Sequence, residues 1–138
     1  MGYNYLSSEW YKKSYKVFNR SYSNQIDKKI KKDKKGVLNK FKKLPPHTKI
    51  YCAHEYTAAN AQFSLSVEPN NSDLLNTVER VAQLRAKQQA TVPTTLEQEL
   101  ATNPFLRADS PEIKATLGLQ TASELAVFTE LRKRKNRF

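Results

Sequence analysis

The chain has 138 residues, 38% of them hydrophobic, and carries a formal net charge of +11. This length suits one domain with a core and some appendages, and it excludes two large domains. No apolar run approaches the roughly 20 residues that a membrane-spanning helix needs, so we expect a soluble protein without a membrane partner. The one cysteine, Cys52, cannot form an internal disulfide, which favours a reducing compartment and excludes a secreted disulfide scaffold.

The positive charge is concentrated at the start of the chain. Residues 1–46 carry 13 Lys and Arg against 3 acidic residues, whereas residues 47–138 carry 11 against 10. The net charge therefore describes the first third of the sequence and says little about the remainder. This first third lacks the apolar stretch of a secretion signal and is a poor match to an Arg-rich, acid-free transit peptide, so we expect a cytoplasmic protein.

The first 56 residues predict little regular structure. Residues 1–43 form a basic segment rich in Tyr and Lys, which we expect to be partly helical or disordered, with a basic helix over about 37–43. The Leu-Pro-Pro run at 44–46 ends that helix, because proline disfavours helix in the residue before it. The next run, Thr48–Ala53 (TKIYCA), is expected to form one strand. A single strand is not stable alone, so either its partners are missing from this chain or helices cover it.

Helix signals follow one another from residue 57 to the end of the chain. Each expected helix begins with a residue that can cap its free backbone N–H groups. The helices are expected over about 57–67, 72–89, 95–101, 111–117 and 122 to the basic tail, and their caps are Thr57, Asn71 or Ser72, Thr94 or Thr95, Ser110, and Thr121. Gly118 suits the end of the fourth helix. The fold class that follows is mainly α, with about five helices after one residual strand.

Three separated stretches form a recognisable set. They are LPPHTKIYCAHEYTAANAQFSLSVEPNN at 44–71, ATVPTTLEQELATNPFLR at 90–107 and LRKRKNRF at 131–138. In this order they resemble the C-terminal part of glyoxalase II, the hydroxyacylglutathione hydrolases. The resemblance covers roughly Leu44 to Phe138, about two thirds of the chain.

The resemblance implies a fold, an activity and a ligand. Residues 44–56 would be the residual strand and metal-ligand loop of a truncated metallo-β-lactamase-type domain, and residues 57–138 a helical glutathione-binding domain. Members of the family hydrolyse S-D-lactoylglutathione to D-lactate and glutathione, the second step of methylglyoxal disposal. They use two metal ions, usually zinc. The implied partner is therefore a glutathione thioester.

Four residues match positions that carry function in the family. The resemblance implies that His54 is a metal ligand and that Tyr56 contacts the glutathione part. Arg132 and Lys135 match the pair that grips the glycine carboxylate of glutathione, and Asn136 stands where the family commonly has aspartate. Two cations one helical turn apart offer a fork and a point charge to one anion. Without the resemblance, we would interpret His54 as an ordinary hydrogen-bonded residue and the two cations as part of a solvated tail.

Most metal ligands of the family have no counterpart in this sequence. The family takes them from an H-x-H-x-D-H motif, a later histidine and a bridging aspartate, and the only other histidine here, His47, is interpreted as a turn residue. One imidazole cannot hold zinc or lower the pKa of a bound water towards 7. We therefore expect no catalytic residue in this chain and no hydrolysis by it alone, unless another chain supplies the metal-binding half. Glu55 invites a general-base role, but we interpret it as structural.

Two alternatives stay open. In residues 1–43 lysines alternate with aromatic side chains, which could neutralise phosphates and stack on bases, so the chain could be a polyanion-binding or nucleic-acid-binding module. It contains no defined reader motif, and such binding would be weak and non-specific. The other alternative is a non-functional fragment, because the first 36 or so residues look unrelated to the family.

Overall fold

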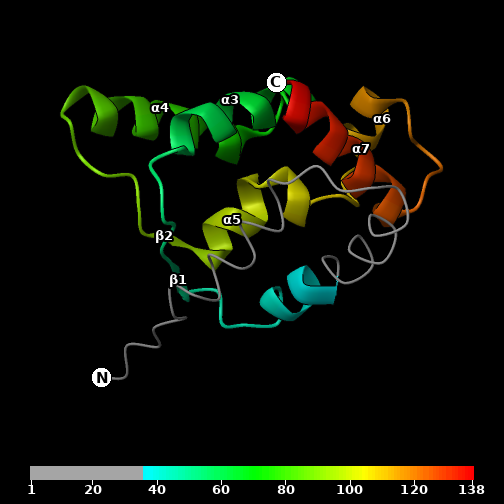
Figure 1. The fold of residues 1–138 in the computed structure, drawn as a ribbon, viewed down its shortest axis with the longest axis horizontal. Coiled ribbons are helices and arrows are strands. Elements are labelled where there is room, and N and C mark those ends of the chain that lie inside the picture. The colour runs from blue at the N-terminus through cyan, green and yellow to red at the C-terminus, as the bar shows by residue number, and fades with distance from the viewer. Residues whose placement is uncertain (1–35) are drawn as a thin grey trace.

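Residues 36–138 are described by the structure, a computed structural model of the chain. Most of this part is helical, as Figure 1 shows. The elements are a short helix over 36–41, α3 (Thr57–Val67), α4 (Ser72–Ala86), α5 (Leu96–Thr102), the 3₁₀ turn η1 (Pro104–Leu106), α6 (Pro111–Leu117) and α7 (Glu124–Arg137). None of the helices in residues 36–138 is long and apolar enough to cross a membrane. The mainly α fold is confirmed.

The basic segment expected at 1–43 falls largely outside the described residues. Only its last part, the helix over 36–41 and the turn that follows, is described. The nucleic-acid-binding alternative depends on this segment and therefore also falls outside the described part of the chain.

The expected strand is shorter than predicted, and its partner lies within the chain. β1 (Lys49–Ile50) pairs with β2 (Thr94–Thr95) in antiparallel register, with Lys49 opposite Thr95 and Ile50 opposite Thr94. The contact continues past the strands, because the backbone N–H of Leu96 donates to the Thr48 carbonyl at 2.9 Å. The expectation of an unpartnered strand is thus wrong. Thr94 and Thr95 are too short a run beside Pro93 to show a strand pattern in the sequence. They form a strand only because they pair with β1.

The helix boundaries agree with the capping chemistry at most positions. The side chains of Asn71, Thr95 and Ser110 accept backbone hydrogen bonds at the starts of α4, α5 and α6. Gly118 ends α6 in the left-handed conformation, with φ of 71°, which a residue without a Cβ adopts at little cost. Two expected caps are wrong. Tyr56, not Thr57, precedes α3 and makes no side-chain cap, and Ser123, not Thr121, caps α7.

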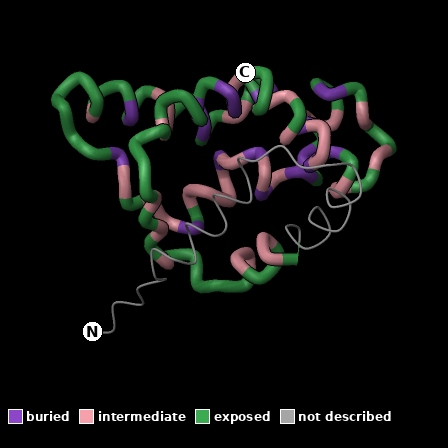
Figure 2. The backbone as a smooth tube through the Cα atoms, in the orientation of Figure 1, coloured by how far each residue is buried: buried purple, intermediate pink, exposed green. Residues whose placement is uncertain are grey.

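The core lies between α3, α6 and α7. Each helix contributes apolar side chains at helical spacing, and Figure 2 marks the buried residues along the chain. The main core side chains are Phe63, Val67, Ile113, Leu117, Val127, Phe128 and Leu131. This packing fixes the position of α7 against α3, which brings the basic C-terminal turns of α7 beside Phe63.

A buried carboxylate joins three segments of this core. Glu68, which ends α3, is 2% exposed and accepts hydrogen bonds from Arg107 (2.9 and 2.8 Å), Ser110 (2.7 Å) and Asn71 (2.9 Å). Burial by itself would raise the pKa of Glu68, but the hydrogen bonds from Arg107, Asn71 and Ser110 and the charge of Arg107 together lower it. The residues that cap α4 and α6 therefore also donate hydrogen bonds to Glu68, and Arg107 neutralises its charge.

Candidate functional site

A cavity of about 660 Å³ lies between α3, α4 and α5 and reaches the last turns of α7. Its walls are mostly apolar and include Phe63 from α3, Leu74 from α4, Leu96 from α5 and Phe105 from η1. Its charged lining, among residues 36–138, consists of Arg80, Glu99, Arg132 and Lys135. A mostly apolar cavity with a few charged groups has the character of a small-molecule site.

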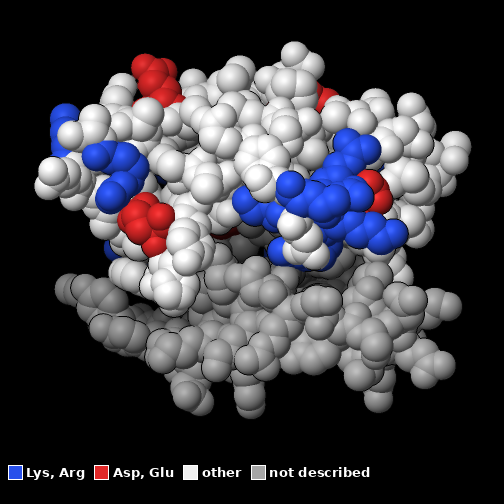
Figure 3. Space-filling view, turned by 45° about the horizontal axis from the view of Figure 1, so that its top comes forward, with Lys and Arg blue, Asp and Glu red and all other residues white. Residues whose placement is uncertain are grey.

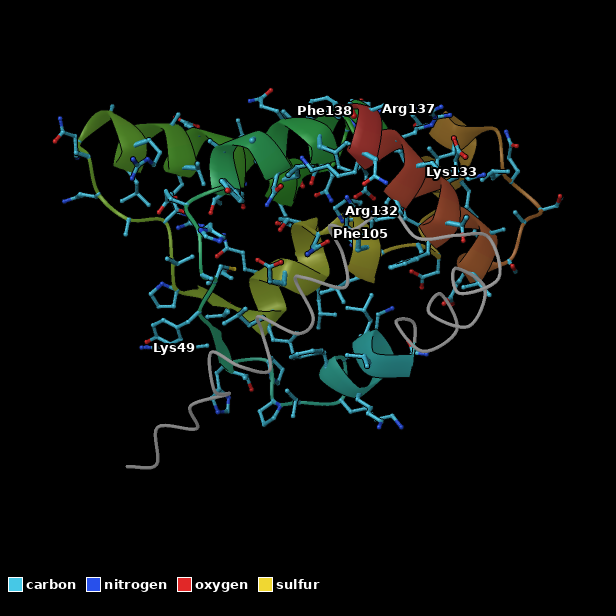
Figure 4. All side chains as sticks on the ribbon, viewed as in Figure 1. Lys49, Phe105, Arg132, Lys133, Arg137 and Phe138 are labelled. Atoms are coloured by element: carbon cyan, nitrogen blue, oxygen red, sulfur yellow. The ribbon has the colours of Figure 1, made fainter. Side chains whose placement is uncertain are left out.

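The end of α7 carries a dense group of basic residues. They are Arg132, Lys133, Arg134, Lys135 and Arg137. Figure 3 shows basic side chains gathered in a cluster on one face of the molecule. Within this group Arg132 and Lys135 line the cavity, because residues three apart share one face of a helix. Arg134 instead pairs with Glu130 at 3.2 Å, and Figure 4 shows Lys133 on the opposite side of α7 from Arg132.

Aromatic rings lie against Arg132 and Lys135 in the cavity wall. The guanidinium carbon of Arg132 is 5.9 Å from the centre of the Phe105 ring, and Figure 4 shows the two side chains next to each other. The Lys135 Nζ is 5.2 Å from the ring centres of both Phe63 and Phe138. A ring face attracts a cation without neutralising its charge. These contacts hold both cationic groups at the wall of the cavity.

The surroundings of the pair favour an incoming negative charge. Among the described residues no carboxylate forms an ion pair with Lys135. Burial lowers the pKa of Lys135, and the nearby charge of Arg132 lowers it further. Asn136 Oδ1 accepts hydrogen bonds from Nε (2.9 Å) and Nη2 of Arg132, which orients the guanidinium without neutralising it. Two neighbouring cations in a half-buried place suit a carboxylate ligand.

His54 and Tyr56 lie in the loop between β1 and α3. Their rings stack, with centroids 5.2 Å apart and planes 27° apart. Cys52 and Thr57, on either side of them, line the cavity, whereas neither ring is part of its lining. α3 then forms the wall from this loop to Phe63, a distance of roughly 10 Å along the helix axis. The structure thus brings Arg132 and Lys135 together in the cavity and places His54 and Tyr56 in a loop that borders it.

Glu55 fastens this loop to the segment before β2. Its carboxylate accepts hydrogen bonds from the backbone N–H (3.1 Å) and the hydroxyl of Thr91, which is itself buried. Arg85 lies 4.0 Å away. The hydrogen bonds from Thr91 are the main reason that the pKa of Glu55 is lowered, and the charge of Arg85 adds to them against a small effect of burial. Both carboxylate oxygens are engaged, which agrees with the structural role expected for Glu55.

The comparison with protein families decides the family of this fold. The sequence matches the family model "Hydroxyacylglutathione hydrolase C-terminus" over residues 55–138, a range that contains α3 to α7 with Arg132 and Lys135. The chain belongs to this family.

Similar proteins carry the full name hydroxyacylglutathione hydrolase. The protein of that name from Methylococcus capsulatus is 54% identical over 101 residues, which cover 73% of this chain and 40% of the relative. The one from Jannaschia sp. is 52% identical over 103 residues, 75% of this chain and 40% of the relative. The one from Roseobacter denitrificans is 50% identical over 101 residues, with shares of 73% and 40%. The chain therefore matches about two fifths of the length of these relatives.

The residues at hand do not fit the metal centre that a hydroxyacylglutathione hydrolase is expected to hold. Within residues 36–138 no group of three or more His, Cys, Asp or Glu side chains is placed to bind a metal ion. His54 has Tyr56 as its ring neighbour, and the nearby Glu55 carboxylate is engaged by Thr91. One imidazole beside an engaged carboxylate is too small a donor set for a zinc site.

Several residues of the site were missed in the sequence. Three aromatic side chains contact Arg132 or Lys135, and they are Phe63, Phe105 and Phe138. Glu99 lines the same cavity. Phe105 belongs to the Asn-Pro-Phe stretch of the resemblance, but nothing in its spacing assigns it to Arg132. Such contacts join residues far apart in the chain, so no local pattern indicates them.

Proposed function

We propose that residues 57–138 bind the glutathione part of a glutathione thioester, and that Arg132 and Lys135 bind its glycine carboxylate. The observation that carries this proposal is the selective placement of these two side chains. Among the basic residues at the end of α7, they line the cavity and rest on aromatic rings, while Arg134 pairs with Glu130. A guanidinium and an ammonium side by side provide the charge-assisted hydrogen bonds that a carboxylate needs.

Tyr56 is proposed to contact the same ligand from the loop that borders the cavity. An extended tripeptide spans roughly 10 Å, which matches the length of α3 from this loop to Phe63. A phenol can offer a hydrogen bond together with an aromatic face. The neighbouring His54 would then stand near the thioester end of the ligand, as expected of a metal ligand in a dinuclear zinc site.

The reaction proposed for the complete assembly is hydrolysis of S-D-lactoylglutathione to D-lactate and glutathione. The relatives are named for hydroxyacylglutathione hydrolysis, and this chain matches about two fifths of their length. We propose that the described residues supply the binding half of the site. Turnover would also need the metal-binding half of the family, the metallo-β-lactamase-type domain.

The binding proposal is tested with S-methylglutathione, a thioether that cannot be hydrolysed, by isothermal titration calorimetry on the full chain. We expect binding that weakens about tenfold to a hundredfold in Arg132→Gln and in Lys135→Gln, because each variant loses a charge-assisted hydrogen bond. Lys133→Gln is the matched control. It removes the same charge from the same helix but lies outside the cavity, so its affinity should stay unchanged.

Two results would contradict the proposal. Equal weakening in all three variants would indicate a general attraction between the basic tail and anions. No binding by the unmodified chain would favour the alternative of a non-functional fragment. Incubation of the chain with S-D-lactoylglutathione and zinc tests separately whether turnover needs the metal-binding half. Loss of the thioester with the chain alone would show that this chain holds enough metal ligands for catalysis.

A further inference from the structure

The cavity holds one acidic side chain among its described lining residues. Glu99, on α5, is half-buried, and its Oε2 accepts a hydrogen bond from Asn103 Nδ2 at 2.8 Å. Thr94 also hydrogen-bonds to this carboxyl. Burial, the largest influence, raises the pKa of Glu99, and these two hydrogen bonds oppose it. A carboxyl group facing an otherwise mostly apolar cavity gains from a cationic partner there.

The position of Glu99 relative to the cation pair suits an elongated ligand. Glu99 lies on α5, and Phe105, which contacts Arg132, lies on the next element, η1, and both line the cavity. A ligand with a carboxylate at Arg132 and Lys135 would occupy the same cavity as Glu99. Lys135 and Arg132 attract the negative end of such a ligand, and Glu99 attracts a positive one.

We propose that Glu99 selects ligands that carry a free ammonium group, and that it binds the α-ammonium of the glutamyl residue of glutathione. This inference rests on the proposed function, since the ligand is held at its other end by Arg132 and Lys135. The γ-glutamyl residue leaves its α-amine free and charged, unlike the amide nitrogens of an ordinary peptide. An ammonium in reach of Glu99 makes a charge-assisted hydrogen bond with it. Glu99 is thus a specificity-determining residue for γ-glutamyl thiol derivatives.

The test compares two ligands on the full chain by isothermal titration calorimetry. One is S-methylglutathione, and the other is the same compound with its α-amine acetylated. We expect the unmodified chain to bind the free amine at least about tenfold more tightly, because acetylation removes the charge that Glu99 binds. In Glu99→Gln this preference should disappear, mainly through weaker binding of the free amine. Glu97→Gln, an exposed carboxylate on the same helix, is the matched control and should keep the preference.

Each outcome decides between the two proposals. If the unmodified chain binds both ligands equally, or if Glu99→Gln keeps the preference, this inference is wrong while glutathione binding stands. If the unmodified chain binds neither ligand, the proposed function itself fails. Far-UV circular dichroism checks that Glu99→Gln is folded, and the preference of the unmodified chain tests the inference even if that variant does not fold.

Discussion

Two groups of charged side chains in this molecule are balanced in different ways. Glu68 is 2% exposed, and Arg107, Ser110 and Asn71 donate hydrogen bonds to it from within the fold. Arg132 and Lys135 are half-buried cations that rest on aromatic rings beside a cavity. A buried charge that is paired within the fold stabilises the fold, whereas a cation in the wall of a cavity can meet a ligand there. The difference separates the residues that stabilise the domain from those that serve its function.

The comparison is tested most strongly by Glu68→Ala. Removal of the carboxylate leaves Arg107 without this partner, and Ser110 and Asn71 each lose the hydrogen bond that they donate to it. The free energy of unfolding should therefore fall by about 3–5 kcal/mol. Urea denaturation followed by circular dichroism measures this change. Glu112→Ala is the control, because the Glu112 carboxylate joins Asn70 to α6 at the surface and should cost about 1 kcal/mol or less. Equal losses of stability in the two variants would show that the buried network of Glu68 contributes no more than a surface hydrogen bond.

The pH dependence of stability gives the second test. The pKa of Glu68 in the folded state lies below its ordinary value of 4.5. The stabilisation from the ionised carboxylate is therefore fully present above pH 4.5 and is lost as the pH falls from there through the folded-state pKa. The urea midpoint of the unmodified chain should decrease in this window more steeply than that of Glu68→Gln. Parallel decreases would assign the acid sensitivity to other carboxylates.

The stabilising residues were only partly predictable, because capping is local and ion pairing is not. Asn71, Thr95 and Ser110 could be predicted as caps, since each directly precedes its helix and accepts a hydrogen bond from the backbone N–H three residues on. The pairing of Glu68 with Arg107 spans 39 positions, and no local sequence pattern around either residue indicates it. For the same reason β2 was missed, because its two residues become a strand only by pairing with β1.

The candidate site shows the same division. Arg132 and Lys135 could be placed on one helical face from their spacing alone. Their orientation towards a cavity depends on Phe63 and Phe105, which come from other elements and were not predicted. The sequence predicts Thr57 as a cap, whereas its hydroxyl forms a hydrogen bond with the hydroxyl of Thr91, 34 positions away. Local spacing thus indicates which residues act together, and tertiary contacts decide what they face.

The third test is Lys135→Met, for which the comparison predicts a change of opposite sign to that of Glu68→Ala. Burial lowers the pKa of Lys135 below 10.5, so its charged form is disfavoured in the folded state. This penalty is present at neutral pH and disappears only at high pH, when the amine is neutral in both states. A methionine keeps the packing between Phe63 and Phe138 and removes the penalty. Unfolding at pH 7 should cost slightly more free energy, by no more than about 1 kcal/mol, while affinity for S-methylglutathione falls.

The control and the contradicting result for this variant concern the aromatic rings. Lys133→Met makes the same chemical change at an exposed position of α7 and should leave both stability and affinity unchanged. A large loss of stability in Lys135→Met would show that attraction between the ammonium and the rings of Phe63 and Phe138 outweighs the cost of burial. Lys135 would then belong with Glu68 as a stabilising charge.

The smallest expected effect concerns Glu55, a carboxylate that is paired like Glu68 but more exposed. Its carboxylate accepts two hydrogen bonds from Thr91, as a stabilising charge would, but its side chain is 30% exposed. Glu55→Gln keeps the size of the side chain and one acceptor oxygen, so thermal unfolding should show a loss of only about 0.5 kcal/mol. Because this carboxylate fastens the loop of Tyr56, the affinity for S-methylglutathione should fall more clearly than the stability. If stability falls as far as in Glu68→Gln, exposure does not determine how much a paired carboxylate contributes to this fold.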